Sequence, residues 1–586
     1  MDHNQNSQGG ERADRDKLQL KKHSRYAAER ITDRMAWRLA AQIPVPASDT
    51  FAVVVFNPLS WRRSGIVQGR AVVYGTPRSS DIAAFRKNGL RLVNDRGETV
   101  PYVPLVRHEG LSITLELAFH ADTIPAAGYR TWYLVPGYNP IDNDNIRPCE
   151  IRLDKENEKN PEAVWNYSTD ASMPIGPRRN IGSDQYRNPH YDLTIDRVTG
   201  DLTLADRATG KVILNRMAIL GVEERGGNYI ADMTPSGRTF PALIDTVETL
   251  DNNALWCRLR ITGSVYGMPF RQTLTLPVSS PEIQIENEIH WTGPRSVRLQ
   301  QTFPWAGPGN TIRYGVPFGH VTYPGAMVSP NGSDLGRQGD EIPAEDREKM
   351  RLCQHWVDIG DDTGGLTIAA DHRMWEIDPK NSPQLRAYMI RGINHCTGAV
   401  IRDEDDELHA IARPPAGDYT FRYILRPRHA AFADSAGYRR GWELNRPALV
   451  TAVGGRNAQT STPLPTSDSL LDLTDTTLVT TAIKKAEDSD ALVIRAFEAT
   501  GHTTTLPTPP PPLATHFRVF ETEILEESRH PLVTPSSVRP FEIKTLILET
   551  DTASPPVRIG QENPAQHQPT TYPKKTSENI INSHLK

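Results

Sequence analysis

Cysteine is scarce in this sequence. The four cysteines among its 586 residues stand far apart, at Cys149, Cys257, Cys353 and Cys396. No two of them form a Cys-x-x-Cys pair, so we expect neither a zinc ribbon nor a dense disulfide framework. Widely spaced cysteines also fit a reducing compartment.

The sequence also lacks an excess of positive charge and any long apolar run. Lys and Arg number 66 against 71 Asp and Glu, a formal net charge of −5, so a basic surface for nucleic acid is not expected. No apolar run approaches the roughly 18 residues that span a bilayer. The opening segment 1–17 has no apolar core of a secretory signal. We therefore expect a cytoplasmic protein that binds neither nucleic acid nor membrane.

Proline, by contrast, is frequent. It occupies 47 of 586 positions, above the usual share of about 5%. Because proline interrupts helices and central strands alike, this excess argues against a mainly helical protein and favours many short elements with loops. At roughly 150 residues per domain, the length predicts several domains.

One long helix is predicted near the start, over 21–43, after a polar segment 1–20 that we expect to be disordered. Its apolar stripe recurs every four residues and consists of Ala27, Ile31, Met35 and Leu39. That spacing lies on one helical face, and Pro44 ends the helix. Since a single amphipathic helix has to dock its apolar face, we interpret 21–47 as a remnant of a helical bundle.

After this helix the apolar period changes from four to two, which is typical of strands. The clearest strand signals are 51–56, 111–119, 129–135, the hairpin 193–204, 283–291 and 541–548. They predict an antiparallel, mainly β protein, because no strand–helix alternation appears. The expected division is a β-sandwich domain over 48–138, a linker over 139–180, a large sandwich over 181–447, a C-terminal β domain over 448–551 and a disordered tail over 552–586.

Six segments, in the same order, resemble one known family. They are Val54 to Trp61 (V-V-F-N-P-L-S-W), Ile124 to Tyr133, Tyr191 to Gly210, Val316 to Gly319 (V-P-F-G), Ala491 to Glu498 and Pro540 to Thr545 (P-F-E-I-K-T). Together they resemble the C-terminal β region of family 38 glycoside hydrolases, the α-mannosidases. The resemblance implies a galactose-mutarotase-like β-supersandwich flanked by smaller β-sandwich domains, with one N-terminal helix.

The family places its catalysis on an N-terminal β/α barrel, which is not recognisable in this sequence. That barrel holds one zinc ion and two carboxyl groups, one acting as nucleophile and the other as acid/base. Retaining hydrolysis needs such a pair about 5 Å apart. The sequence contains no His-His pair, which the family's zinc motif requires. We therefore assign no catalytic residue, metal ligand or cofactor to this chain, although the intact family uses zinc.

Two segments match catalytic or metal-binding patterns only by their letters. His190-Tyr191-Asp192 reads as His-x-Asp, but it lies in a predicted hairpin and has no second motif, so a surface histidine at a strand entry is the better interpretation. The acidic run Asp403 to Glu407 is interpreted as a solvated loop.

Two positions are candidates for substrate binding, both implied by the resemblance. Tyr229, in Gly227-Asn228-Tyr229, resembles a family loop tyrosine that points toward the sugar, where a phenol hydrogen-bonds hydroxyls or stacks on the ring. Arg391 falls where the family has an arginine-bearing strand near the substrate, and its planar fork suits vicinal hydroxyls. Without a barrel above them, both side chains are expected to be solvent-accessible on one side of the molecule.

The resulting hypothesis is the C-terminal portion of an α-mannosidase that takes part in carbohydrate binding and mannoside hydrolysis but is inactive alone. Whether the chain is an enzyme stays open at this point. Two alternatives remain: a non-catalytic subunit that completes a separately encoded barrel chain, or a free-standing carbohydrate-binding protein. The expected partners are an α-mannoside and, for the second role, that barrel.

Overall fold

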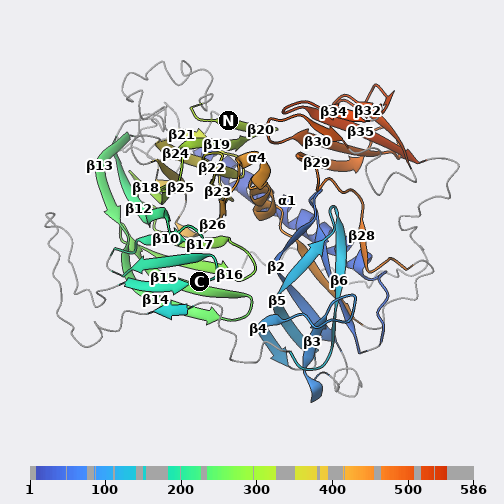
Figure 1. Cartoon of the computed structure of the whole chain (residues 1–586), viewed down its shortest axis with the longest axis horizontal. Helices are drawn as coiled ribbons and strands as arrows, with labels where there is room; N and C mark the ends of the chain where they lie inside the picture. Colours follow the sequence, from blue (N-terminus) through green and yellow to red (C-terminus); the bar gives the residue numbers. More distant parts are fainter. Residues whose placement is uncertain are drawn as a thin grey trace.

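The computed structural model confirms the predicted mainly β class. It describes residues 8–47, 49–74, 85, 87–109, 112–139, 150–152, 183–197, 199–225, 234–294, 296–324, 350–378, 383–392, 414, 416–454, 463–506, 517–533 and 535–550. Within these ranges every pair of named strands is antiparallel, and the strands form three β bodies crossed by one long helix (Figure 1). No helix in the described part of the chain is long and apolar enough to cross a membrane.

The first β body is a two-sheet sandwich. Its larger sheet contains β27 (Leu449–Gly454), β1 (Phe51–Asn57), β6 (Gly128–Pro136), β28 (Ser467–Ser469) and β3 (Leu90–Val93). Its smaller sheet contains β2 (Arg63–Tyr74), β5 (Ser112–Ile124) and β4 (Tyr102–Glu109). Val53, Leu117 and Trp132 belong to one buried cluster drawn from both sheets, so the predicted alternation at 112–119 faces this core.

The central body is the supersandwich. Nine strands form one sheet: β14 (Leu243–Asn252), β15 (Trp256–Val265), β16 (Met268–Pro277), β17 (Ile283–Trp291), β26 (Gly417–Arg428), β23 (Gly365–Ala370), β22 (Trp356–Gly360), β19 (Thr311–Val316) and β20 (Gly319–Thr322). Six form the second: β13 (Thr234–Pro241), β12 (Ile219–Arg225), β18 (Val297–Pro304), β25 (Gln384–Gly392), β24 (Met374–Asp378) and β21 (Met350–Leu352). A third sheet holds β11 (Val212–Met217), β10 (Leu202–Asp206), β9 (Tyr191–Asp196), β8 (Ser183–Arg187) and β7 (Glu150–Arg152). All three contribute to one buried core.

Three amides cross the core of the supersandwich and join its two large sheets. Gln272 Nε2 on β16 donates to Asn287 Oδ1 on β17 at 2.9 Å and to Gln301 Oε1 on β18 at 3.1 Å. Asn287 Nδ2 donates to Gln301 Oε1 at 2.9 Å. All three residues are at most 3% exposed. Buried amides have to pair with one another, so this set favours one facing register of the sheets.

The C-terminal body is a smaller sandwich. One sheet contains β29 (Leu478–Lys485), β30 (Leu492–Glu498), β35 (Ile543–Thr550), β32 (Phe517–Thr522) and β33 (His530–Pro531). The other contains β31 (Thr504–Leu506) and β34 (Ser536–Val538). The strand predicted at 541–548 is β35, and its buried residues Leu546 and Leu548 pack in the core of this body.

The predicted start of the C-terminal domain at 448 is wrong. Strand β27 pairs with β1 over Phe51↔Gly454 to Phe56↔Leu449, and β28 pairs with β6. Both strands therefore complete the first sandwich, and the C-terminal body begins with β29. A strand's partner depends on long-range pairing, which local periodicity does not specify.

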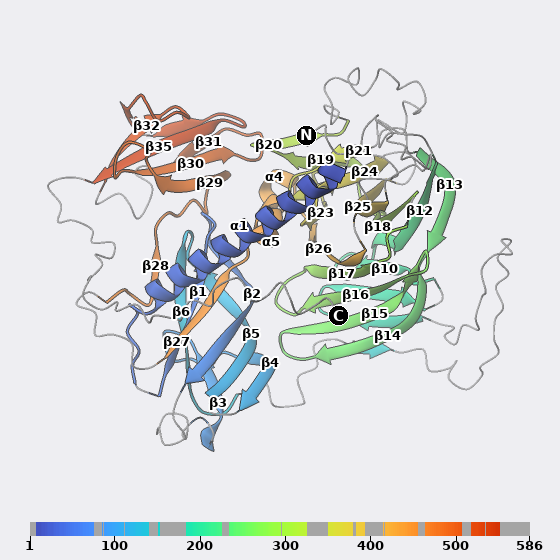
Figure 2. The same cartoon turned by 180° about the vertical axis from the view of Figure 1, so that it is seen from behind.

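The predicted helix is present and longer than expected. It spans Gln8–Ala40 as α1, so residues 8–20 are helical rather than disordered; they are rich in Glu, Arg, Lys and Leu, which favour helix. Among the residues of α1 whose side chains the structure describes, Ala36 and Ala40 near its C-terminal end are buried. The side chains of Ile31 and Met35 are 62% and 42% exposed, which confirms the expected uncovered face. Figure 2 shows α1 crossing from the first sandwich toward the supersandwich.

Two short helices that the sequence analysis missed follow β26. They are α4 (Phe432–Ser435) and α5 (Tyr438–Asn445). Helix α5 packs against β22, β23 and β26 of the nine-stranded sheet. Trp61, the last residue of the V-V-F-N-P-L-S-W segment, donates from Nε1 to Glu443 Oε1 at 2.9 Å. This bond ties the first sandwich to the supersandwich.

The supersandwich and the C-terminal sandwich meet at the V-P-F-G and P-F-E-I-K-T segments. The ring of Phe541 lies against Gly319, where an added Cβ would come within 2.8 Å of the Phe541 ring. His320 packs edge-on against Phe541 at 5.1 Å, and its Nδ1 lies 3.2 Å from the carbonyl oxygen of Ala499. These contacts explain why a glycine stands at the end of the V-P-F-G turn.

We predict that removing the central amide of the supersandwich weakens the whole fold. Asn287→Ala removes two buried hydrogen bonds, one from Gln272 Nε2 and one to Gln301 Oε1, and leaves only the bond between Gln272 and Gln301. Each lost bond contributes about 0.5–1.5 kcal/mol. Urea denaturation followed by tryptophan fluorescence should show a loss of about 2 kcal/mol or more. The matched control is Gln284→Ala, a half-buried position on the same strand, expected to change stability by less than about 0.5 kcal/mol. Equal effects of both variants would contradict the role of the amide set.

Candidate functional site

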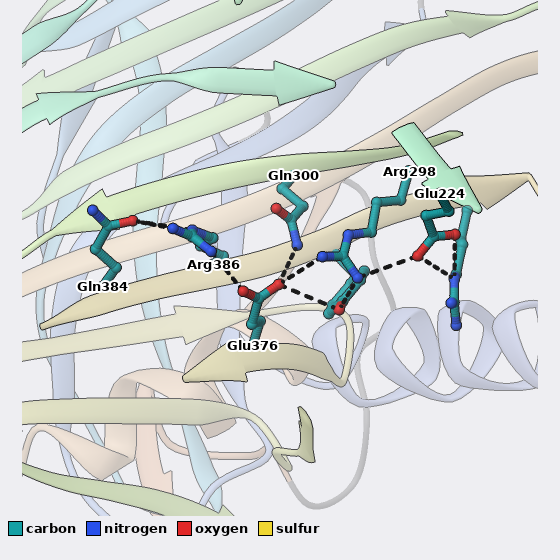
Figure 3. A network of polar contacts seen from close by, with 8 residues as sticks. Glu224, Arg298, Gln300, Glu376, Gln384 and Arg386 are labelled. Atoms are coloured by element: carbon teal, nitrogen blue, oxygen red, sulfur yellow. Dashed lines mark hydrogen bonds and ion pairs between the residues drawn. The ribbon is translucent and has the colours of Figure 1, made fainter. Parts of the chain in front are cut away.

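Arg391 belongs to a buried network of charged and polar side chains on the six-stranded sheet (Figure 3). The chain of contacts runs from Gln384 at one end to Glu224 and Arg391 at the other. Its members are Glu224 on β12, Arg298 and Gln300 on β18, Glu376 on β24, and Gln384, Arg386, Tyr388 and Arg391 on β25. Four neighbouring strands thus contribute to one network.

Glu224 holds Arg391 at one end. Arg391 Nε donates to Glu224 Oε2 at 2.8 Å and to Oε1 at 3.1 Å, and Arg298 Nη1 donates to Oε1 at 3.2 Å. The Glu224 side chain is fully buried and that of Arg391 is 12% exposed. The expectation that Arg391 is solvent-accessible is therefore wrong for most of its side chain. A buried carboxylate requires a paired cation, and Arg391 supplies it.

Glu376 organises the other end. It accepts hydrogen bonds from Arg298 Nη2 at 3.0 Å, Gln300 Nε2 at 3.0 Å and Arg386 Nη1 at 2.5 Å. Burial raises the pKa of Glu376, whereas the charges of Arg298 and Arg386 and the hydrogen bond from Gln300 lower it. The lowering is the larger effect, so the pKa of Glu376 lies below its ordinary value. Glu376 is thus an ionised structural anchor and a poor proton donor near neutral pH.

Tyr388 links the two halves. Its hydroxyl accepts from Arg298 Nη1 at 2.6 Å and lies 3.4 Å from Glu376 Oε2. The Arg298 guanidinium carbon also stands 4.7 Å from the centre of the Tyr388 ring. Burial raises the pKa of the Tyr388 phenol, so it remains protonated and donates to the carboxylate.

A β-bulge brings Arg391 onto the same face as Tyr388. In the pairing of β18 with β25, Leu299 faces Ile390 while Gln300 faces Tyr388, which leaves Met389 as the extra residue. Residues three apart on a regular strand point to opposite faces, and one extra residue reverses this. Strand alternation alone would have separated Arg391 from the network, so no sequence signal indicated Glu224, Arg298 or Glu376 as its neighbours.

The network carries one excess positive charge, because three arginines (298, 386 and 391) face two carboxylates (224 and 376). Each carboxylate is bound by two arginines. Such an arrangement is suited to holding a guanidinium in place, and less suited to transferring protons. Within the described ranges, no three His, Cys, Asp or Glu side chains are grouped to hold a metal ion.

The structure places only one of the two predicted site residues. Tyr229 lies outside the described residues, in the segment between β12 and β13. Glu224, which binds Arg391, stands next to last on β12 and so directly before this segment. The chain thus leads from the arginine network into the segment that contains Tyr229.

The other sequence matches are structural. His190 Nε2 lies 3.4 Å from the carbonyl oxygen of Val278, and Asp192 accepts from Arg187 Nε at 2.6 Å. They stand at the entry of β9, which confirms the interpretation of His190-Tyr191-Asp192 as a strand entry. The acidic run 403–407 lies outside the described residues.

Comparison with known proteins agrees with this architecture. Residues 186–374 match the glycosyl hydrolases family 38 C-terminal domain, and residues 477–546 match the glycosyl hydrolases family 38 C-terminal beta sandwich domain. The first match covers most of the supersandwich and the second covers the C-terminal sandwich. No curated protein matches.

Two solved structures share the fold of this chain. An α-mannosidase from Enterococcus faecalis V583 is 14% identical with a TM-score of 0.60, covering 87% of this chain and 57% of its own. A family 38 glycosyl hydrolase from Enterococcus faecalis is 15% identical with a TM-score of 0.61, covering 91% of this chain and 62% of its own. A putative aldose 1-epimerase from Escherichia coli K12 also matches, over 41% of this chain, at 12% identity and a TM-score of 0.23.

The β bodies and both matched domains define a relative of the glycosyl hydrolases. More narrowly, residues 186–374 and 477–546 are similar to the two C-terminal domains of glycosyl hydrolase family 38. It spans about three fifths of the length of the two enterococcal structures.

We predict a pH-dependent role of Glu376 in stability. In Glu376→Gln the side chain is neutral, so Arg386 loses its ion pair with Glu376 and Arg298 keeps only the one with Glu224. Breaking a buried ion pair costs about 3–5 kcal/mol. Because the folded pKa of Glu376 is lowered, its contribution is present above its unfolded pKa of about 4.5 and is lost as pH falls through the folded pKa.

Denaturation midpoints of Glu376→Gln and the unmodified chain between pH 7 and pH 3 test this. Their difference should be largest at pH 7 and should shrink below about pH 4.5. Glu248→Gln, whose side chain is 52% exposed, serves as the control and should differ little at any pH. A difference that stays constant with pH would contradict the ionised state of Glu376.

Proposed function

We propose that this chain forms the β portion of a family 38 α-mannosidase and that the Arg391 network supports one wall of its sugar-binding site. The observation that carries the proposal is the placement of Arg391. It is held by Glu224 at the end of the strand that leads into the segment with Tyr229. The likeness to an enterococcal α-mannosidase supports mannosides as the substrate class.

In this role Arg391 binds and orients, without taking part in proton transfer. The two bonds from Nε to Glu224 fix the guanidinium plane, and a fixed planar fork binds neighbouring hydroxyls with little further loss of conformational entropy. Tyr229 would add a phenol to the same wall. The nucleophile, the acid/base and the zinc ligands would come from a barrel, so the chain alone is proposed to bind sugar without hydrolysing it.

We predict that the purified chain binds methyl α-mannoside weakly and that Arg391→Gln lowers the affinity about tenfold, the effect of losing one charge-assisted hydrogen bond. Saturation-transfer NMR titration measures it. Arg260→Gln is the matched control, since Arg260 lies on β15, away from the Arg391 network, with its side chain 34% exposed and an ion pair to Glu248 at 3.5 Å. Equal affinities of the Arg391 and Arg260 variants would contradict the site. Turnover of an aryl α-mannoside with zinc that a point mutation in this chain abolishes would contradict the binding-only role.

A second candidate function, docking onto a separately encoded barrel chain, is favoured by helix α1. Its outer face exposes large apolar side chains, including Leu20, Ile31, Met35 and Leu39, each at least 40% exposed. Contiguous apolar surface of this kind often marks an interface. On this proposal the barrel chain covers the helix and completes the enzyme.

The docking proposal predicts that the double change Ile31→Ser, Met35→Ser prevents complex formation without unfolding the chain, because both side chains are already exposed. Size-exclusion chromatography of the mixed chains measures the complex, and the thermal midpoint of the chain alone checks its fold. Asp33→Ser, on the opposite face of the same helix turn, should leave the complex intact. A complex that survives the double change would exclude α1 as the docking surface.

A further inference from the structure

A pocket of about 370 Å³ lies between the supersandwich, helix α5 and the C-terminal sandwich. The supersandwich contributes Phe318, His355 and the segment Asp371 to Arg373; α5 and its C-cap contribute Trp442, Asn445 and Arg446; and the C-terminal sandwich contributes Phe497. None of these residues belongs to the Arg391 network. Ligand pockets form preferentially at such meetings of domains, and this volume suits a ligand with a single ring.

One wall of the pocket is aromatic because α5 approaches the sheet closely. Gly441 permits this approach: a Cβ there would come within 2.7 Å of the His355 carbonyl oxygen. His355 has a positive φ of 70°, and its ring centre lies 4.5 Å from that of Trp442. Phe318 is 42% exposed beside them. The wall therefore presents flat, partly exposed rings.

Two arginines, Arg373 and Arg446, give the pocket a positively charged side. Neither Arg373 nor Arg446 forms an ion pair among the described residues, whereas the neighbouring Arg440 is paired with Glu282 and Glu443. Arg446 Nη1 donates only to the carbonyl oxygen of Asn445, at 2.9 Å. Two guanidinium groups without carboxylate partners are thus available to an anion in a chain whose net charge is −5.

The effect of these arginines is visible at His355. Burial lowers the pKa of His355 to about 4, and the charges of Arg446 and Arg373 contribute to the shift. The imidazole is therefore neutral near pH 7, and the positive charge at this end of the pocket comes from the two arginines. Both guanidinium groups are near enough to act on the same small volume.

Polar groups that suit hydroxyls complete the lining. Asn445 Nδ2 donates to the carbonyl oxygens of Ala370 at 3.0 Å and Gly441 at 2.8 Å, which fixes the amide. Asp371 Oδ1 accepts from the backbone N–H of Arg422 at 3.1 Å. Oriented acceptors of this kind select the direction of hydroxyl donors.

We propose that this pocket binds a pyranose unit that carries a negatively charged group, a carboxylate or a phosphate. The rings of Trp442 and Phe318 would cover the apolar face of the sugar, Arg373 and Arg446 would bind the anionic group, and Asp371 and Asn445 would accept its hydroxyls. No residue of the pocket belongs to the Arg391 network, so this proposal can be tested independently of the proposed function.

Isothermal titration of the purified full chain at low salt tests the proposal with four probes. They are a methyl hexuronide, a hexose 6-phosphate, the neutral methyl α-mannoside and inorganic phosphate. We expect one or both anionic sugars to bind at least about tenfold more tightly than the neutral sugar and than phosphate at this pocket. The first two probes distinguish a carboxylate from a phosphate. Inorganic phosphate that binds as tightly as both sugars would show a simple anion site and overturn the proposal.

Variants assign the binding to this pocket. Arg373→Gln and Arg446→Gln should each weaken the anionic sugar about tenfold, and Trp442→Leu should weaken it with the charge unchanged. Arg271→Gln, a surface arginine on β16 paired with Glu288, is the control and should bind normally. Thermal midpoints confirm that each variant is folded. Unchanged binding in folded Arg373→Gln and Arg446→Gln would overturn the assignment.

Discussion

The pairing of β27 with β1 completes the first sandwich with a strand that follows the supersandwich in the chain. After leaving the supersandwich, the chain returns to the first sandwich. There six residues of β27 pair in register with β1, the first strand in the sequence. Helix α1 rests its buried end on β27 and β1, and Gly69 of β2 lies directly against Val450 of the returning strand. The first sandwich is therefore incomplete until most of the chain has been made. When strands far apart in the sequence pair, the chain between them loses conformational entropy before the stabilising contacts form.

The segments that carry the family resemblance hold neighbouring strands and turns together within the β bodies. Asn57 is one example: its amide donates to the carbonyl oxygens of Trp61 and Pro125, at 2.7 and 2.9 Å, and so joins two of the resembling segments. Glu498 is another, because its buried carboxylate accepts from the backbone N–H groups of Gly501 and Phe541. Both side chains satisfy backbone groups that would otherwise be buried without partners. The resembling segments therefore contribute the hydrogen bonds that fix strand ends inside the first and C-terminal sandwiches.

The candidate site residues were predicted less well than the fold. Arg391 was found through the resemblance, but its ion pair with Glu224 across β12, β18 and β25 was not. A local sequence pattern does not specify which strands become neighbours, and β12 and β25 are far apart in the chain. The bulge at Met389 adds a second difficulty, since it reverses the alternation on which face assignments rest. The expectation of an exposed Arg391 failed for that reason.

The sequence by itself determined the elements with strong periodicity, namely the helix with its four-residue stripe and the strands at 51–56, 129–135 and 283–291. Periodicity follows from which face is buried, and burial of apolar side chains is encoded residue by residue. Tertiary structure alone decided that β27 belongs to the first sandwich and that Arg373 and Arg446 share a pocket with Trp442. These outcomes depend on contacts between residues far apart in the chain, whose free energy exists only when the bodies are assembled.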